Sequence, residues 1–399
     1  MIADPDLWLW GQYAVRAWPT AVFVDPRGRV VARHEGEFDL PDVRDFIAGA
    51  LARAETDDLL EPAPWSHDPL PAGGGVLRFP GGVLGDPRRD RLFAADSGHH
   101  RVVVCGHDAR VVAAYGSGEP GFADGPAARA RFRQPRGLAL DPAGSTLFVA
   151  DEENHAVRAV DLASGRVATV AGTGEQGSSR RAGSPALETP LSSPTDLAVL
   201  DGRLWIAMAG THQLWTLDLA SGALTVAAGS GAEGLHDGPL AGAAFAQPSG
   251  LATDPRTGAL FVADAESSAI RRVAPASDRV RRLVGRGLFA FGDQDGTGDE
   301  VRLQHPLAVA AGDDDGPMVF VADTYNDKIK RLDPATRRLE TVAGGAPGHE
   351  DGPLAGARFR QPSGLALAGR RLYVADTDNH AIRRVNLDAA TVETLDVRE

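Results

Sequence analysis

The sequence predicts a mainly β protein: a six-bladed β-propeller preceded by a short α/β segment. A phrase of the form apolar-Phe-Val-Ala-Asp recurs, with one degenerate copy, six times at intervals of 53 to 59 residues. Self-similarity at a fixed period is the signature of solenoids and propellers. The chain of 399 residues also contains 47 Gly and 27 Pro residues, which indicates many turns between short strands.

Each repeat reads as four short strands. The last residues of the six phrases, called here the anchors, are Asp96, Asp151, Met208, Asp264, Asp323 and Asp376. Apolar residues recur six and nine positions after each anchor, and most repeats begin with a Pro-led stretch such as Gln361-Pro362-Ser363-Gly364-Leu365-Ala366-Leu367. These stretches are rich in Gly and Ala, as expected for the strand nearest the axis of a propeller. The near-continuous apolar runs fit sheets that are covered on both faces by neighbouring blades.

Residues 1–54 lie outside the repeat. Helical patterns at 6–15 and 41–54 flank two strand patterns, at 21–25 and 28–35. Residues 55–75 are rich in Pro and Gly, which is typical of a linker. We therefore predict an α/β segment at 1–54, a linker at 55–75 and a propeller at 76–399.

Composition narrows the classes of function. The 43% hydrophobic fraction supports a real core, and the single cysteine, Cys105, excludes an internal disulfide and a thiolate metal cluster. The net charge of −13 disfavours binding to nucleic acid and to anionic membranes. Residues 1–6 show no basic start to a signal peptide, and no run of 18 apolar residues follows. We expect a cytoplasmic protein with neither nucleic-acid nor membrane partners.

Two motifs point to a family. The phrase Ala150-Asp151-Glu152-Glu153-Asn154-His155-Ala156-Val157-Arg158 and its other copies resemble the NHL repeat. The segment Trp18-Pro19-Thr20-Ala21-Val22-Phe23-Val24 resembles the cis-proline segment and following hairpin of thioredoxin-like domains. Together they resemble the NHL repeat-containing protein two family, which implies a thioredoxin-like domain followed by a six-bladed propeller.

The resemblance covers the chain with one departure. Only the back half of a thioredoxin-like domain is present, so the redox Cys-x-x-Cys of such domains would lie upstream, and Pro19, the expected cis-proline, is the one redox-site position that carries over. We expect Met1 to be a late or misassigned start, or the chain to be a natural truncation.

In a propeller, the loops between second and third strands and the loops between blades open on one face. The residues there that differ between repeats, or that offer polar chemistry, predict a ligand site comprising Arg136, His155, Asp196, His305 and His380. The competing interpretation is that histidines repeated four positions after an anchor serve the blade. Likewise, the anchor aspartates could cap the turns that follow them, and the Asp-Gly-Pro loops, such as that at Asp124, could be simple turns or calcium ligands.

No catalytic constellation is evident in the sequence, and we expect no cofactor and no bound metal. The first hypothesis is therefore a non-enzymatic interaction scaffold whose loop face binds a protein or a small ligand. The second is a truncated thiol-disulfide oxidoreductase-like protein with its redox cysteines upstream of this chain. The third is a metal-dependent, lactonase-like hydrolase.

Overall fold

The computed structural model describes residues 20–24, 30–35, 40–56, 75–106, 108–182, 185–254, 256–312 and 317–399. The chain divides into two compact units, Met1–Pro69 and Leu70–Glu399. Within the described ranges, no helix is both long and apolar enough to cross a membrane.

The first unit contains a hairpin and a helix. Strands β1 (Thr20–Val24) and β2 (Val30–Glu35) pair antiparallel, and helix α2 (Leu40–Thr56) follows. The rings of Phe23 and Phe46 lie 4.7 Å apart, so the hairpin packs against the helix. The two strands lie within one or two residues of their predicted bounds, and the helix begins one residue earlier and ends two residues later than predicted. The helical pattern at 6–15 and Pro19 fall outside the described residues, and the thioredoxin-like character of this unit stays a prediction.

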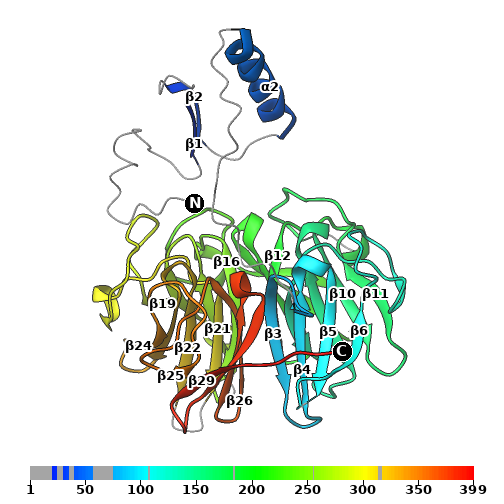
Figure 1. Cartoon of the computed structure of the whole chain (residues 1–399), viewed down its shortest axis with the longest axis vertical. Helices are drawn as coiled ribbons and strands as arrows, with labels where there is room; N and C mark the ends of the chain where they lie inside the picture. Colours follow the sequence, from blue (N-terminus) through cyan, green and yellow to red (C-terminus); the bar gives the residue numbers. More distant parts are fainter. Residues whose placement is uncertain are drawn as a thin grey trace. The chain divides into compact units, whose positions relative to one another are not determined.

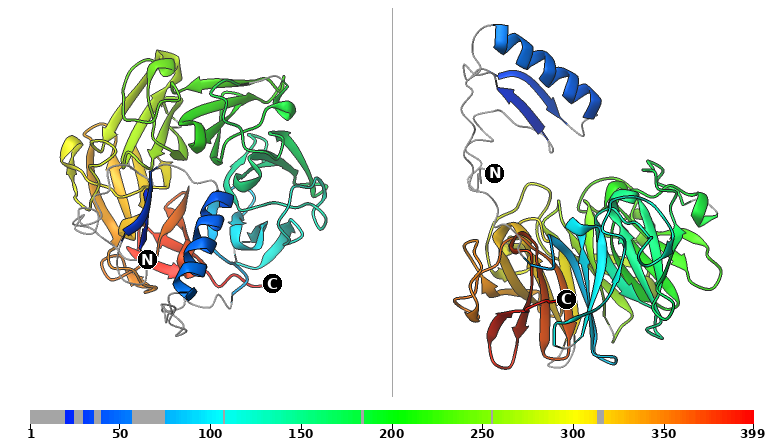
Figure 2. Two further views of the ribbon diagram at one scale, coloured as in Figure 1. Left: turned by 90° about the horizontal axis from the view of Figure 1, so that it is seen from above. Right: turned by 45° about the vertical axis from the view of Figure 1, so that its right-hand side comes forward.

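The second unit is a six-bladed β-propeller, as the repeats predict (Figures 1 and 2). Each blade is one antiparallel sheet, and its four main strands follow one another in the sequence from the axis outward. In blades 1 to 3 the strands are β3 (Pro80–Asp86), β4 (Arg91–Asp96), β5 (Arg101–Gly106) and β6 (Val111–Tyr115); β8 (Pro135–Leu140), β9 (Thr146–Asp151), β10 (Ala156–Asp161) and β11 (Arg166–Ala171); and β12 (Pro194–Leu200), β13 (Arg203–Met208), β14 (Gln213–Asp218) and β15 (Leu224–Ala228). In blades 4 to 6 they are β16 (Pro248–Asp254), β17 (Ala259–Asp264), β18 (Ala269–Ala274) and β19 (Arg279–Val284); β21 (Ala308–Gly312), β22 (Met318–Asp323), β23 (Lys328–Asp333) and β24 (Arg338–Gly344); and β26 (Pro362–Ala368), β27 (Arg371–Asp376), β28 (Ala381–Asn386) and β29 (Thr391–Thr394).

Short elements complete the blades. Two-residue strands add a fifth strand at the outer edge of blades 2, 5 and 6; they are β7 (Gly125–Pro126), β20 (Gly296–Thr297) and β25 (Gly352–Pro353). Single 3-10 turns follow the second strand of five blades; they are η1 (Ser97–His99), η2 (Glu152–Asn154), η4 (Ala209–Thr211), η8 (Thr324–Asn326) and η9 (Thr377–Asn379). Other such turns are η3 (Ala186–Glu188), η5 (Leu240–Gly242), η6 (Pro275–Ser277) and η7 (Gly298–Glu300).

The ring closes without exchanging a strand between the two ends of the propeller. Each innermost strand contacts the next one around the axis, and β26 lies beside β3. The C-terminal segment then crosses to blade 1, where the Val111 N–H donates to the Arg398 carbonyl at 2.8 Å. Leu395 and Val397 pack against the core of blade 1. Closure therefore rests on sheet packing and on this final segment.

The hydrophobic core lies between blades, which explains the near-continuous apolar runs. One cluster joins Phe148 and Val157 of blade 2 to Leu204, Ile206 and Trp215 of blade 3, and the Trp215 side chain is fully buried. A sheet covered on both faces cannot alternate apolar and polar residues. The near-continuous apolar runs are thus explained by the burial of both faces of each sheet between neighbouring blades.

Glycines set how closely the inner strands approach the axis. A Cβ placed on Gly82 would lie 2.2 Å from the Arg136 carbonyl oxygen, and one on Gly137 would lie 2.3 Å from the Asp196 Cα. Both distances are below any normal contact, so a side chain at either position would push neighbouring blades apart. The axial opening is consequently lined by backbone and a few selected side chains.

Candidate functional site

The repeated charged residues form buried clusters within the blades. In blade 2 the Arg158 guanidinium, fully buried, donates to Asp151 at 2.7 Å and to Asp124 at 2.6 Å. The same guanidinium donates to the Arg131 and Ala123 carbonyls, each at 2.9 Å. A buried charge is tolerated when it is paired and its hydrogen bonds are satisfied. Arg271, Lys330 and Arg383 occupy the same place in blades 4, 5 and 6.

These clusters correct the expectation that the anchor aspartates cap the turns that follow them. The Asp151 carboxylate makes no capping hydrogen bond to the backbone of turn η2, which follows it. Its Oδ1 accepts the N–H of Arg133, which precedes the inner strand, at 2.7 Å, and its Oδ2 accepts the side-chain amide of Asn154 at 2.8 Å. Asp124 of the Asp-Gly-Pro loop accepts the Thr169 N–H at 3.0 Å. Partial burial alone would raise the pKa of Asp124. The hydrogen bonds from Thr169 and Arg158 outweigh burial, and the pKa lies below its ordinary value. Both carboxylates are therefore used inside the blade.

The repeated histidines connect neighbouring blades. The Ser193 N–H of blade 3 donates to His155 Nδ1 of blade 2 at 3.1 Å, and the Phe79 N–H ahead of blade 1 donates to His380 Nδ1 of blade 6 at 3.1 Å. Asp327 does the same in blade 5, accepting the Gln361 N–H at 2.7 Å. An Nδ1 that accepts must be unprotonated, so the neutral imidazole carries its proton on Nε2. His155 and His380 thus join blades, and their further role as ligand contacts stays a prediction.

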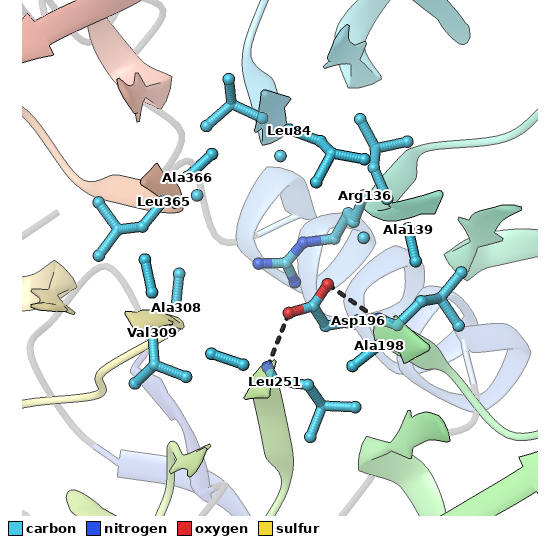
Figure 3. Close-up of a pocket in the computed structure, with 18 of the residues that line it drawn as sticks. Leu84, Arg136, Ala139, Asp196, Ala198, Leu251, Ala308, Val309, Leu365 and Ala366 are labelled. Carbon is cyan, nitrogen blue, oxygen red and sulfur yellow. Dashed lines mark hydrogen bonds between the residues drawn. The ribbon is translucent and has the colours of Figure 1, made fainter. Parts of the chain in front are cut away.

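The axial opening is a cavity of about 340 Å³ lined by the innermost strands of all six blades (Figure 3). Two charged side chains from the predicted site, Arg136 and Asp196, point into it. Asp196 lies two residues after the first proline of its inner strand, where four other blades have Gly and blade 5 has Ala308. At this position of the inner strands, blade 3 therefore carries a carboxylate, whereas the other five blades carry Gly or Ala.

Asp196 is held by backbone donors of two blades. It accepts the Leu251 N–H of blade 4 at 2.7 Å and the N–H of Leu197 at 2.8 Å. Burial raises the pKa of Asp196 to about 7, against the lowering effect of these two hydrogen bonds and of Arg136. Arg136 itself lies 3.4 Å from both carboxylate oxygens of Glu152, a long contact. The site therefore holds a carboxyl group that can exchange a proton near neutrality beside a guanidinium that is not tightly paired.

A second polar group lies between blades 4 and 5 and contains His305. Its ring stacks on Tyr325 with centroids 4.5 Å apart, and its Nδ1 lies 3.4 Å from Glu266 Oε1. Burial, with a contribution from Arg136, lowers the pKa of His305 to about 4. Burial also raises the pKa of Glu266 to about 7, assisted by Glu233 and Asp264.

The electrostatic influence of Arg136 reaches Asp196, His305 and Tyr325. We call Arg136, Asp196, Glu266, His305 and Tyr325 the mouth group. Of the five predicted residues, Arg136 and Asp196 lie in the axial cavity and His305 lies beside Glu266 and Tyr325, while His155 and His380 lie at blade junctions. The sequence analysis missed Glu266 and Tyr325. Both lie two positions after an anchor, where the other repeats have Gly, Glu or Asp. This variation between repeats could have identified the position as a candidate from the sequence.

In the part of the chain that the structure describes, neither the single cysteine nor a cluster of metal-ligating side chains forms a second centre. Cys105 is buried in the core of blade 1, where burial raises the pKa of its thiol to about 11. Among the residues that the structure describes, no three His, Cys, Asp or Glu side chains are grouped so that they could hold a metal ion.

Comparison with known proteins agrees with the repeat analysis. The NHL repeat model matches residues 359–384. The chain is 38% identical to NHL repeat-containing protein 2 of Homo sapiens, over 100% of this chain and 59% of that protein. It is also 38% identical to Protein SUPPRESSOR OF QUENCHING 1, chloroplastic, of Arabidopsis thaliana, over 97% of this chain and 38% of that protein. The chain therefore spans less than two thirds of either relative.

Solved structures agree on the fold. A protein of unknown function from Bacteroides thetaiotaomicron superposes with a TM-score of 0.58 at 15% identity, over 77% of this chain and 69% of that one. A gluconolactonase of Xanthomonas campestris superposes with a TM-score of 0.51 at 15% identity, over 80% and 86%. At such identities the likeness concerns the fold alone. With its repeats, its six blades and these relatives considered together, the chain contains an NHL repeat and is a homologue of NHL repeat-containing protein 2.

Proposed function

We propose that this propeller is a non-enzymatic interaction scaffold that binds a protein segment or a small polar ligand at the mouth group. One observation carries the proposal. The charged residues and histidines that recur in the repeats are used in contacts within and between blades, whereas the members of the mouth group are specific to single blades. Two of them, Arg136 and Asp196, line the axial cavity, and a few charged groups placed in a concave site are typical of a binding site.

The chemistry of the mouth group favours binding over catalysis. Arg136 offers guanidinium donors, Asp196 a carboxyl group held by two backbone N–H groups, and the His305–Tyr325 pair a stacked aromatic surface. Such a set can recognise a polar ligand that combines acceptors with a flat or apolar part.

The two enzymatic hypotheses stay predictions. The thiol-disulfide hypothesis places its cysteines outside this chain. The hydrolase hypothesis needs a metal, and its structural analogue shares the fold at 15% identity. No contact in the described residues favours either one.

The test is a ligand screen with matched variants. A library of small polar compounds and synthetic peptides is screened against the chain by ligand-observed NMR, and the hits are titrated against Arg136→Ala, Asp196→Asn and a triple variant with Arg136, His155 and His305 replaced. Arg129→Ala is the control, because Arg129 is an exposed arginine of another loop. We expect hits to lose at least about tenfold in affinity in the mouth variants and to keep it in the control. Hits that bind all variants equally would refute the proposed site.

A further inference from the structure

The axial cavity has its charged groups near one end. The innermost strands of all six blades line it, and because the blades repeat the same strand order, these strands run in the same direction along the axis. Arg136 is the second residue of β8 and Asp196 is the third residue of β12, so both lie near the same end. Among the described residues that line the cavity, these two alone have a charged or titratable side chain.

Glycines allow the guanidinium and the carboxyl group to lie close together. A Cβ on Gly81 of β3 would lie 3.2 Å from Arg136 Cγ, so the Arg136 stem lies against the start of β3. A Cβ on Gly137, the residue after Arg136, would lie 2.5 Å from Asp196 Oδ1. The carboxyl group therefore occupies space that a side chain at position 137 would fill. Figure 3 shows both charged side chains directed into the cavity from neighbouring strands.

Both charged groups keep unused hydrogen-bonding capacity. A carboxylate can accept about four hydrogen bonds, and Asp196 accepts one on each oxygen, from the Leu251 and Leu197 N–H groups. A guanidinium has several N–H donors, and within the described residues Arg136 donates through Nη1 alone. The two side chains do not form an ion pair with each other, although the charge of Arg136 favours the ionised form of Asp196. A ligand can therefore engage both charges at once.

The rest of the lining suits an apolar group. The hydroxyl groups of Thr195, Ser249 and Ser363 donate to backbone carbonyls of the propeller, so they serve the blades. Further along the axis, the lining includes apolar residues that keep part of their surface exposed; they are Leu84, Leu140, Val199 and Leu367. Covering apolar surface of this kind with an apolar ligand group stabilises the complex.

From these observations we infer that the axial cavity binds a free α-amino acid with an apolar side chain. Arg136 binds its carboxylate, Asp196 binds its ammonium group, and its side chain extends along the axis. A free amino acid carries both charged groups on one carbon atom, whereas the two ends of a peptide lie further apart. The cavity volume of about 340 Å³ is at the lower end of the range for small-molecule sites, which limits the ligand to this size. The inference rests on the proposed function of the mouth group and names its ligand.

The experiment uses the full chain and isothermal titration calorimetry at about pH 8, where Asp196, with its pKa raised by burial to about 7, is mostly ionised. Leucine, valine and methionine are titrated in turn. We expect saturable binding with a Kd below about 1 mM for the tightest of them. Its N-acetyl derivative lacks the ammonium group and its amino alcohol lacks the carboxylate, so each should bind at least about tenfold more weakly. Glycine, without an apolar side chain, should be weaker by a similar factor.

Variants and analogues together assign each charge. In Asp196→Asn, the preference for the amino acid over its N-acetyl derivative should fall to within about twofold, while the preference over the amino alcohol remains. In Arg136→Gln, the preference over the amino alcohol should be lost and the other should remain. Arg129→Gln is the control and should keep both preferences, because Arg129 is exposed on another loop. Thermal unfolding of each variant verifies that it is folded.

Three outcomes would overturn the inference: no saturable binding of any of the three amino acids, equal binding of the tightest one and either analogue, or equal binding of that amino acid and its dipeptide. The last result would assign the cavity to the end of a peptide chain. Failure of the proposed function has a different signature, because the hits of the ligand screen would then bind the mouth variants and the parent chain equally. Hits that depend on Arg136 and Asp196, without binding of the amino acids, would refute this inference alone.

Discussion

Replacing Arg158 with Met tests whether the buried clusters stabilise the propeller. The change leaves Asp151, which is fully buried, without its cation, and removes the donors to the Arg131 and Ala123 carbonyls. Removing one partner of a buried pair typically costs about 3–5 kcal/mol. Asp124 adds little to this cost, because its side chain is 48% exposed and water can replace the guanidinium. For a domain of this size the loss corresponds to a fall in Tm on the order of 5–10 °C.

Blade 3 supplies the matched control. There Met208 and Trp215 replace the anchor and its cation together, and both are fully buried. The double variant Asp151→Met with Arg158→Trp copies this pair into blade 2 and removes the unpaired charge. By urea denaturation followed with fluorescence, the double variant should fall between the parent chain and Arg158→Met. A single variant that loses less than about 1 kcal/mol, or a double variant less stable than the single one, would refute the argument that charge burial dominates.

Three other predictions concern titratable groups. Because burial raises the pKa of Asp196 to about 7, the folded state favours its protonated form; this stabilisation is complete below about pH 4 and is lost as the pH rises through 7. The Tm of the parent chain should therefore fall relative to Asp196→Asn between these values, and a constant difference would contradict the assignment. Burial lowers the pKa of His155 below its ordinary value, so the stability that depends on its contact with Ser193 is complete above about pH 6.5 and is lost as the pH falls. His155→Asn, which cannot be protonated in this range, should remove that part of the acid dependence of Tm, and an unchanged profile would exclude His155 as its source. With its pKa raised to about 11, the Cys105 thiol should not react with Ellman's reagent at about pH 8 until the chain is denatured, and rapid labelling of the folded protein would show that the core of blade 1 opens.

The repeats made the fold predictable because they encode local structure and packing together. The anchor strands, the Pro-led inner strands and the six blades all lie where the spacing predicts them. A blade cannot bury its two faces alone, so a sequence with six near-equal sheets has few architectures open to it. The burial of Cys105 was predictable for the same reason. It lies nine positions after its anchor, where the other repeats have apolar residues, and it is buried.

The candidate site was less predictable, because repeat position does not show what a side chain bonds to. The sequence analysis placed His155 and Arg136 in the same set of loops, but His155 follows the turn η2, whereas Arg136 is the second residue of strand β8. The histidine accepts a backbone N–H from the next blade, whereas the arginine projects into the axial cavity. Glu266 and His305 are far apart in the sequence and come within 3.4 Å only because blades 4 and 5 are neighbours. Such pairings depend on the rotation from blade to blade.

The sequence by itself determined the number of blades, the order of strands within them and the residues of the core, because these follow from periodicity and hydrophobic burial, which are local or repeated properties. Only the tertiary structure decided what each polar side chain contacts, for example that Asp196 enters the axial cavity while His155 accepts a backbone N–H from the next blade. Those contacts depend on distances across blade junctions and around the ring, where one carboxylate in place of glycine changes the surface without changing the fold.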